Sequence, residues 1–135
     1  MKVFIGKYPG PKSKRTDPTV RIRIDPWDTW SMDSTLTPII LPMLKQLKTS
    51  KHGAPSTDDK DVPSNIQSIN AKPKEHEHDI DEFHFARWAW VMDEMIFAFE
   101  TKLRDYYTGD DYLKVYARMQ NGFELFGKYF QALWD

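Results

Sequence analysis

The stretch from Ile80 to Leu103 constrains the fold most, because it carries large apolar side chains on nearly every side of a helix. A helix that is apolar all round must be covered all round. We expect this helix at about residues 80–105, with Asp79 as N-cap and Glu82 completing a capping box. The rest of so short a chain offers little to cover it, so we expect part of its surface to be buried against another copy.

A further helix is expected at about residues 110–134, where large apolar residues alternate at spacings of four and three. This spacing is typical of a heptad seam. Gly122 and Gly127 lower helix propensity, which predicts close approach by a neighbouring helix. The last two helices should therefore form a helical hairpin, with the seam residues Tyr112, Tyr116, Met119, Phe123, Phe126, Phe130 and Leu133.

The N-terminal part predicts two short strands and one helix. Lys2–Gly6 is a short β-type run closed by a glycine, and residues 20–25 alternate strictly, so Val20, Ile22 and Ile24 should face a core. Apolar residues at helical spacing predict a helix at about residues 32–49, in which Pro42 should produce a kink or a later start.

Residues 50–79 are rich in Pro, Ser, Asp, Lys and His and predict a long loop. The whole pattern predicts an α+β fold, in which a short N-terminal β-hairpin or small sheet packs on three helices. At 135 residues, the chain is expected to form a single domain, 1–135.

Composition limits the classes of function. The chain has no cysteine and a formal net charge of −1, which fits a reducing compartment and makes nucleic acid an unlikely partner. No apolar run approaches a membrane span of about 20 residues. We expect a cytoplasmic protein with no membrane partner and no cofactor.

Two basic patches and an aromatic turn form the first candidate site. Arginine and lysine hold phosphates by charge-assisted hydrogen bonds, and an indole can stack on a base. The alternative is a solvated basic strand, two core tryptophans and an ordinary lysine-rich helix end. The candidate ligand-binding residues are Arg21, Arg23, Trp27, Trp30, Lys48, Lys51 and His52.

Polar residues in the apolar helix form a second candidate. Charges in such a helix are costly to bury unless they are paired or face a ligand. His84, Arg87 and Glu94 lie on one side of the helix and could line a ligand site. The alternative is an interhelical salt bridge or a face open to water.

A histidine cluster precedes this helix. His76 and His78 point the same way in an extended chain, and His84 or Asp81 could add a further metal ligand. The spacing fits no known metal signature, so we expect no metal site. His52 or His84 could instead act as a general base.

Several stretches resemble a family of small tailed-phage proteins that is abundant in marine phages. Relatives carry a longer insertion where this chain has residues 7–18, and the family has no established catalytic residues to transfer. The resemblance covers most of the chain, in Arg23–Asp33 (RIDPWDTWSMD), Ile40–Lys48 (ILPMLKQLK), Lys51–Gly53 (KHG), Trp90–Glu100 (WVMDEMIFAFE) and Asn121–Asp135 (NGFELFGKYFQALWD).

The resemblance implies a phage accessory protein in the cytoplasm of an infected bacterium. By analogy, small phage proteins of this kind include sponges that sequester immune second messengers. We expect a homo-oligomer that binds a nucleotide-derived molecule, such as a cyclic dinucleotide or cyclic ADP-ribose derivative, without turnover. The alternatives are a small metal- or histidine-dependent phosphodiesterase or hydrolase, and a protein–protein inhibitor or virion component.

Overall fold

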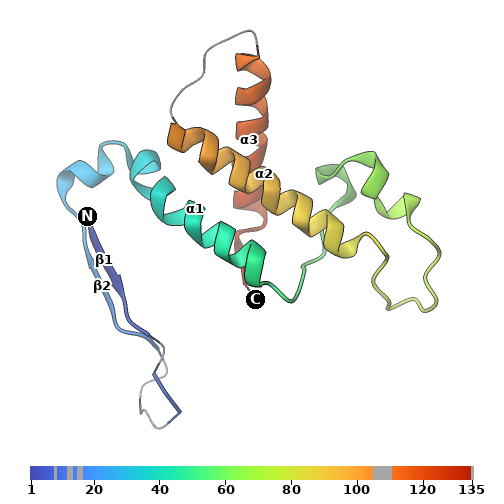
Figure 1. Ribbon diagram of the computed structural model, residues 1–135, viewed down its shortest axis with the longest axis horizontal. Coiled ribbons are helices and arrows are strands. Elements are labelled where there is room, and N and C mark those ends of the chain that lie inside the picture. The colour runs from blue at the N-terminus through green and yellow to red at the C-terminus, as the bar shows by residue number, and fades with distance from the viewer. Residues whose placement is uncertain (8, 12–13, 15–16, 105–110, 135) are drawn as a thin grey trace. The chain divides into compact units, whose positions relative to one another are not determined.

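A computed structural model describes residues 1–135 except 8, 12–13, 15–16, 105–110 and 135. The chain divides into two compact units, an N-terminal unit, Met1–Leu36, and a C-terminal unit, Thr37–Asp135. The predicted α+β composition is confirmed: a two-stranded antiparallel sheet is followed by three helices (Figure 1).

The N-terminal unit is built on a β-hairpin. Strands β1 (Lys2–Ile5) and β2 (Val20–Arg23) pair with Lys2 opposite Arg23 and Ile5 opposite Val20. A 3₁₀ turn, η1 (Pro26–Thr29), follows β2. The expectation that Val20, Ile22 and Ile24 face a core is wrong for this unit, because these side chains are 53%, 59% and 51% exposed. None of its described residues is buried.

Helix α1 (Met32–Ser50) matches its predicted range and contains two prolines, Pro38 and Pro42. Its start is not delayed by Pro42, because Pro38 and Pro42 lie on the exposed side. The carbonyls that lose a hydrogen-bond donor there remain accessible to water. The buried side of the helix is formed by Thr37, Leu41 and Leu44.

Helix α2 (His84–Arg104) begins four residues later than expected. Its first turn is capped by Asp81, whose carboxylate accepts a hydrogen bond from Phe83 N at 2.9 Å. The predicted capping box is wrong because both partners are engaged elsewhere. Asp79 accepts from His76 N, and Glu82 accepts from Lys72 N.

Helix α3 (Tyr112–Lys128) packs closely against α2 and crosses it in Figure 1. A Cβ on Gly122 would lie 2.3 Å from Glu94 O and 2.6 Å from Ala98 Cβ, so only glycine permits this approach. The predicted close approach is confirmed at Gly122. At Gly127 a Cβ would meet nothing within 4 Å, so the described residues show none there.

The predicted seam on α3 is only partly correct. Met119, Gly122 and Leu125 are the buried residues of the helix, whereas Tyr112 and Tyr116 are exposed. The helix also ends before residue 134. After Tyr129 the chain continues as a 3₁₀ turn, η5 (Phe130–Ala132).

Residues 51–79 contain no α-helix or strand but are not a detached loop. They form three 3₁₀ turns, η2 (Asp59–Asp61), η3 (Ser64–Ile66) and η4 (Ser68–Asn70). Val62 is buried in the hydrophobic core, and Ala54 and Ile66 pack against it. This segment therefore covers part of α2, which the sequence pattern does not predict.

The core of the C-terminal unit lies around α2. Trp88, Val91, Met92 and Met95 are each at most 1% exposed. They pack with residues of α1, α3 and the 51–79 segment. Within the described part of the chain, no helix is long and apolar enough to cross a membrane.

Candidate functional site

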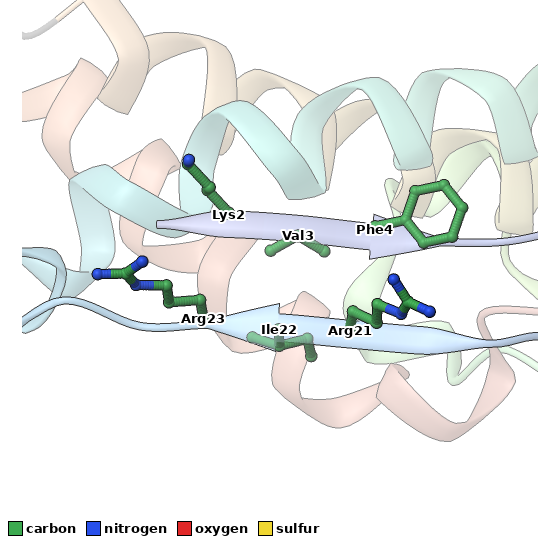
Figure 2. Close-up of a pocket in the computed structure, with 6 residues that line it drawn as sticks. All are labelled: Lys2, Val3, Phe4, Arg21, Ile22 and Arg23. Carbon is green, nitrogen blue, oxygen red and sulfur yellow. The ribbon is translucent and has the colours of Figure 1, made fainter.

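The two faces of the hairpin differ sharply in chemistry. Side chains directly opposite each other in an antiparallel pair point to the same face, and successive residues alternate between faces. We define the basic face as Lys2, Phe4, Arg21 and Arg23, which point to one side in Figure 2. We define the aliphatic face as Val3, Ile5, Val20 and Ile22.

An open depression of about 210 Å³ lies at the hairpin. It is lined by Lys2, Val3, Phe4, Arg21, Ile22 and Arg23 (Figure 2). Two of the predicted phosphate ligands, Arg21 and Arg23, therefore lie at one site. They are joined there by Lys2 and Phe4, which the sequence pattern does not predict as site residues.

The cations of the basic face are largely uncommitted. Among the described residues, no carboxylate forms an ion pair with Lys2 or Arg21. Arg23 lies 3.5 Å from Asp25, and both side chains are well exposed, which makes this a weak interaction. The face can therefore offer three positive groups to an anion.

Formal charge is unevenly distributed along the chain. The first 36 residues contain seven basic and four acidic residues, a charge of +3, whereas the other 99 contain twelve and sixteen, a charge of −4. The near-zero net charge of the whole chain hides this difference. Attraction for anions is therefore concentrated in the N-terminal unit.

Trp27 and Trp30 form an exposed aromatic pair in and just after η1. Their ring centroids are 5.6 Å apart with an interplanar angle of 41°. The two residues are 77% and 81% exposed, so the alternative of two core tryptophans is not what the structure shows. Exposed indoles can stack on a base.

The start of β1 is tied to η1 by charge. The Met1 amino group donates a 2.7 Å hydrogen bond to Asp28 Oδ1 and lies 3.7 Å from Asp25. Asp28 also accepts from Asp25 N at 2.7 Å. The hydrogen bond from the amino group lowers the pKa of Asp28, and the same bond raises the pKa of the Met1 amine. These contacts connect the basic strands to the tryptophan turn within one unit.

The other predicted basic residues belong to the C-terminal unit. Lys48 forms an ion pair with Asp93 of α2, and Lys51 and His52 follow the end of α1. Because Arg21 and Arg23 lie in the other unit, the predicted convergence of the two sets stays a prediction. His84 Nε2 lies 3.0 Å from Ala54 O.

Arg87 forms a buried ion pair that links α2 to the preceding segment. Its two Nη atoms donate to the Asp81 carboxylate at 3.0 and 2.6 Å, and Nη1 also donates to Ile66 O. Both ion-pair side chains are less than 10% exposed. The hydrogen bonds from Arg87 lower the pKa of Asp81. Its Nε has no partner among the described residues.

Glu94 forms the interhelical salt bridge that was the alternative to a ligand-facing role. Arg118 of α3 donates three hydrogen bonds to its carboxylate at 2.6–3.1 Å. The guanidinium carbon also lies 3.8 Å from the ring centroid of Phe97. Glu94 and Arg87 thus have partners within the protein, which accounts for charges in an apolar helix without a ligand.

The histidine cluster does not assemble a metal centre in the part of the chain that the structure describes. His76 and His78 are exposed, whereas His84 is half-buried against Ala54. No group of three or more His, Asp or Glu side chains is arranged to hold a metal ion among the described residues.

Lys2 and Phe4 could have been found from the sequence only by pairing the two strands. The alternation in residues 20–25 indicates which residues of β2 share a face, but not which residues of β1 lie beside them. That choice depends on register, and a shift of one residue exchanges the two faces. In the observed register, Lys2 lies beside Arg23 and Phe4 beside Arg21.

Comparisons with protein-family models, curated proteins and solved structures find no match to this chain. Support for the candidate site therefore comes from the geometry and charge of the hairpin itself.

Proposed function

We propose that this protein binds a nucleotide-derived small molecule on the N-terminal unit and holds it without turnover. The observation that carries the proposal is the basic face, where Lys2, Arg21 and Arg23 lie together with the ring of Phe4. Three cations suit a ligand with two or more phosphates, and an aromatic ring beside them suits a base. The exposed Trp27–Trp30 pair of the same unit offers further stacking surface.

The phage resemblance gives this proposal its setting. The ligand would be met in the cytoplasm of an infected bacterium, as a cyclic dinucleotide or a cyclic ADP-ribose derivative. Sequestration requires tight binding and an intact ligand. Arg87 and Glu94 would then stabilise the C-terminal unit, where they are paired with Asp81 and Arg118.

A thermal-shift screen against cyclic dinucleotides and cyclic ADP-ribose derivatives tests the proposal. A ligand at 100 times its dissociation constant should stabilise the fold by about 2.7 kcal/mol. The double variant Lys2→Gln/Arg21→Gln should lose the shift. Lys60→Gln, which removes an exposed cation from the C-terminal unit, should retain it.

Release of the ligand by denaturation distinguishes binding from catalysis. Recovery of intact ligand supports sequestration, whereas cleaved ligand supports the phosphodiesterase alternative. A screen with no shift for any candidate, or an equal shift in the double variant and the wild type, would contradict the proposed site.

The open shape of the site favours single-stranded nucleic acid as a second candidate. A depression of about 210 Å³ is smaller than the pockets of about 300–1,000 Å³ that usually enclose small ligands. A groove that is basic and aromatic can instead follow a strand, because every base can stack. The charge of +3 on residues 1–36 supports such binding, although the net charge of the whole chain does not.

Salt dependence distinguishes this second candidate. If the three cations of the basic face contact phosphates, the logarithm of the affinity for an oligothymidylate should fall with the logarithm of salt concentration with a slope of roughly −2. Affinity should also rise with oligonucleotide length. Equal affinity for a mononucleotide and a long oligonucleotide would exclude this mode.

A further inference from the structure

The four residues of the basic face are not equivalent, because the strand register places them in two different cross-strand pairs. Lys2 lies opposite Arg23, so one pair consists of two cations. Phe4 lies opposite Arg21, so the next pair on the same face combines an aromatic ring with a single cation. Both pairs line the depression at the hairpin, and their relation is set by the register within the hairpin.

The Lys2–Arg23 pair is suited to one phosphate. Like charges directly opposite each other in an antiparallel pair are destabilising. The contact of Arg23 with Asp25 offsets this repulsion only weakly, since both side chains are well exposed. A phosphate between Lys2 and Arg23 would remove the repulsion and accept a charge-assisted hydrogen bond from each. A local conflict of this kind is expected at a binding site, where the ligand relieves it.

Arg21 is positioned for a different phosphate. It lies two residues from Arg23 on the same strand, which corresponds to about 7 Å along the backbone. Figure 2 shows Lys2 and Arg23 extending toward one end of the hairpin, whereas Arg21 extends the other way, toward Phe4. The two phosphorus atoms of a pyrophosphate share one bridging oxygen, so both would lie near the same pair. In a phosphodiester-linked nucleotide a whole sugar separates successive phosphates, which suits the separation of the two pairs.

We propose that the ligand carries its two phosphates on either side of one ribose, as a phosphodiester-linked dinucleotide does, and not as a pyrophosphate. Lys2 and Arg23 hold one phosphate and Arg21 holds the other. Phe4 stacks on the base that the ribose carries. This inference rests on the proposed function and narrows it, because a cyclic dinucleotide has phosphates spaced in this way and an ADP-ribose derivative has a pyrophosphate. A short oligonucleotide presents the same spacing.

Two isomeric nucleotides test the spacing with the full chain. Adenosine 3′,5′-bisphosphate and ADP have the same base, sugar and number of phosphates, but only the bisphosphate has the ribose between its phosphates. In calorimetric titrations without magnesium, the bisphosphate should bind about tenfold more tightly, since Arg21 adds a charge-assisted hydrogen bond to its second phosphate. ATP is the control for charge, because it has more negative charge than ADP in one run of phosphates. Its affinity should stay below that of the bisphosphate.

Substitutions in the two pairs separate the two phosphate contacts. Arg21→Gln should weaken binding of the bisphosphate by about tenfold and remove its advantage over ADP, because the second phosphate loses its cation. Arg21→Lys, which keeps the charge, should retain most of the advantage. Lys2→Gln should weaken binding of both isomers by a similar factor, since they share the phosphate held by the Lys2–Arg23 pair. Lys60→Gln in the C-terminal unit is the control and should change neither affinity.

The outcomes distinguish this inference from the proposed function. If ADP or ATP binds as tightly as the bisphosphate, or if Arg21→Gln weakens both isomers equally, the phosphate spacing is wrong although the protein binds nucleotides. If neither these nucleotides nor cyclic di-AMP binds, the proposed function and the spacing are both contradicted.

Cyclic di-AMP and oligoadenylates of increasing length identify the source of the phosphates. Tighter binding of cyclic di-AMP indicates a free small molecule, whereas affinity that rises with length indicates a single strand. In both cases Arg21→Gln should weaken the tighter ligand by about tenfold. An unchanged affinity in this variant would overturn the assignment of the second phosphate to Arg21.

Discussion

At the scale of single residues, Gly122 shows most clearly how the sequence determines packing. The absent side chain lets α3 approach the backbone of α2 at Glu94. Because the helices are so close, Met119 and Leu125 become the buried positions on α3. Tyr112 and Tyr116, which a heptad pattern places in the seam, are exposed and stacked on each other with ring centroids 6.1 Å apart.

Gly122→Ala should therefore destabilise the protein. Its Cβ would lie 2.3 Å from a carbonyl oxygen, so the helices must separate, which should lower the free energy of unfolding by about 1–3 kcal/mol. Urea denaturation measures this. The matched control is Gly127→Ala on the same helix, where a Cβ meets nothing within 4 Å and the higher helix propensity of alanine should stabilise by up to about 1 kcal/mol. Equal effects at the two positions would contradict this account.

The Asp81–Arg87 pair predicts a specific pH dependence. Because the pKa of Asp81 is lower in the folded state than its ordinary value of 3.8, its contribution to stability is present above that value and is lost as pH falls below it. Asp81→Asn should lower the free energy of unfolding by about 3 kcal/mol at pH 7, because Arg87 would stay buried without its hydrogen-bonded counter-charge.

The deficit of Asp81→Asn relative to the wild type should shrink as pH falls below about 4, because protons then bind Asp81 more tightly in the unfolded state, where its pKa is higher. Urea denaturation at pH 7 and pH 2.5 measures both values. Asp79→Asn is the control, since Asp79 is exposed and closes only its own turn with His76. A deficit that does not change with pH would show that the charge of Asp81 is not what stabilises this segment.

At the scale of elements, the 51–79 segment is held to the end of α3 by a polar cluster. Lys128 pairs with both Asp58 and Asp61, and these two partners raise its pKa above the ordinary value. Tyr129 OH donates to Asp61 at 2.6 Å and accepts from Asp58 N at 3.0 Å. The segment is thus fixed by hydrogen bonds and by Val62 in the core, without helix or strand.

Tyr129→Phe should loosen this attachment while leaving the helices intact. It removes one hydroxyl with two partners, so the free energy of unfolding should fall by about 1–2 kcal/mol. Hydrogen exchange should show faster exchange of the Asp58 amide and little change in the middle of α2. Uniformly faster exchange throughout the C-terminal unit would mean that the segment is not a separately attached element.

The elements that follow a simple period could be predicted from the sequence, and the others could not. The 3.6-residue period located α1 and most of α2 and α3, and alternation located β2. The predicted start of α2 is four residues too early. The helix begins after Asp81, whose carboxylate accepts hydrogen bonds from both Phe83 N and Arg87, and this arrangement depends on tertiary contacts. The 3₁₀ turns of residues 51–79 have no period, so their contribution to the core was missed.

The candidate site was predicted in part for a similar reason. Arg21 and Arg23 were selected from alternation within one strand, and Trp27 and Trp30 from their position beside it. Lys2 and Phe4 depend on the register between strands. The roles of Arg87 and Glu94 could not be predicted from the sequence, because a buried charge indicates either a bound ligand or an oppositely charged side chain of the same protein. The structure provides partners for both, Asp81 and Arg118.

At the scale of the whole molecule, the two units differ in burial and in charge. The C-terminal unit holds the buried core and pairs most of its interior charges. The N-terminal unit has no buried residue among those described, an excess of three positive charges, and its large side chains exposed. We expect the basic face of this unit to meet the ligand.

The most direct measurement is a titration of ¹⁵N-labelled protein with a cyclic dinucleotide, followed by NMR. We predict that amide signals of Lys2–Ile5 and Val20–Arg23, together with the indole signals of Trp27 and Trp30, shift with added ligand. Signals from the middle of α2 should stay in place. Shifts confined to residues 48–94, or no shifts with any nucleotide-derived ligand, would contradict the assignment of binding to the hairpin.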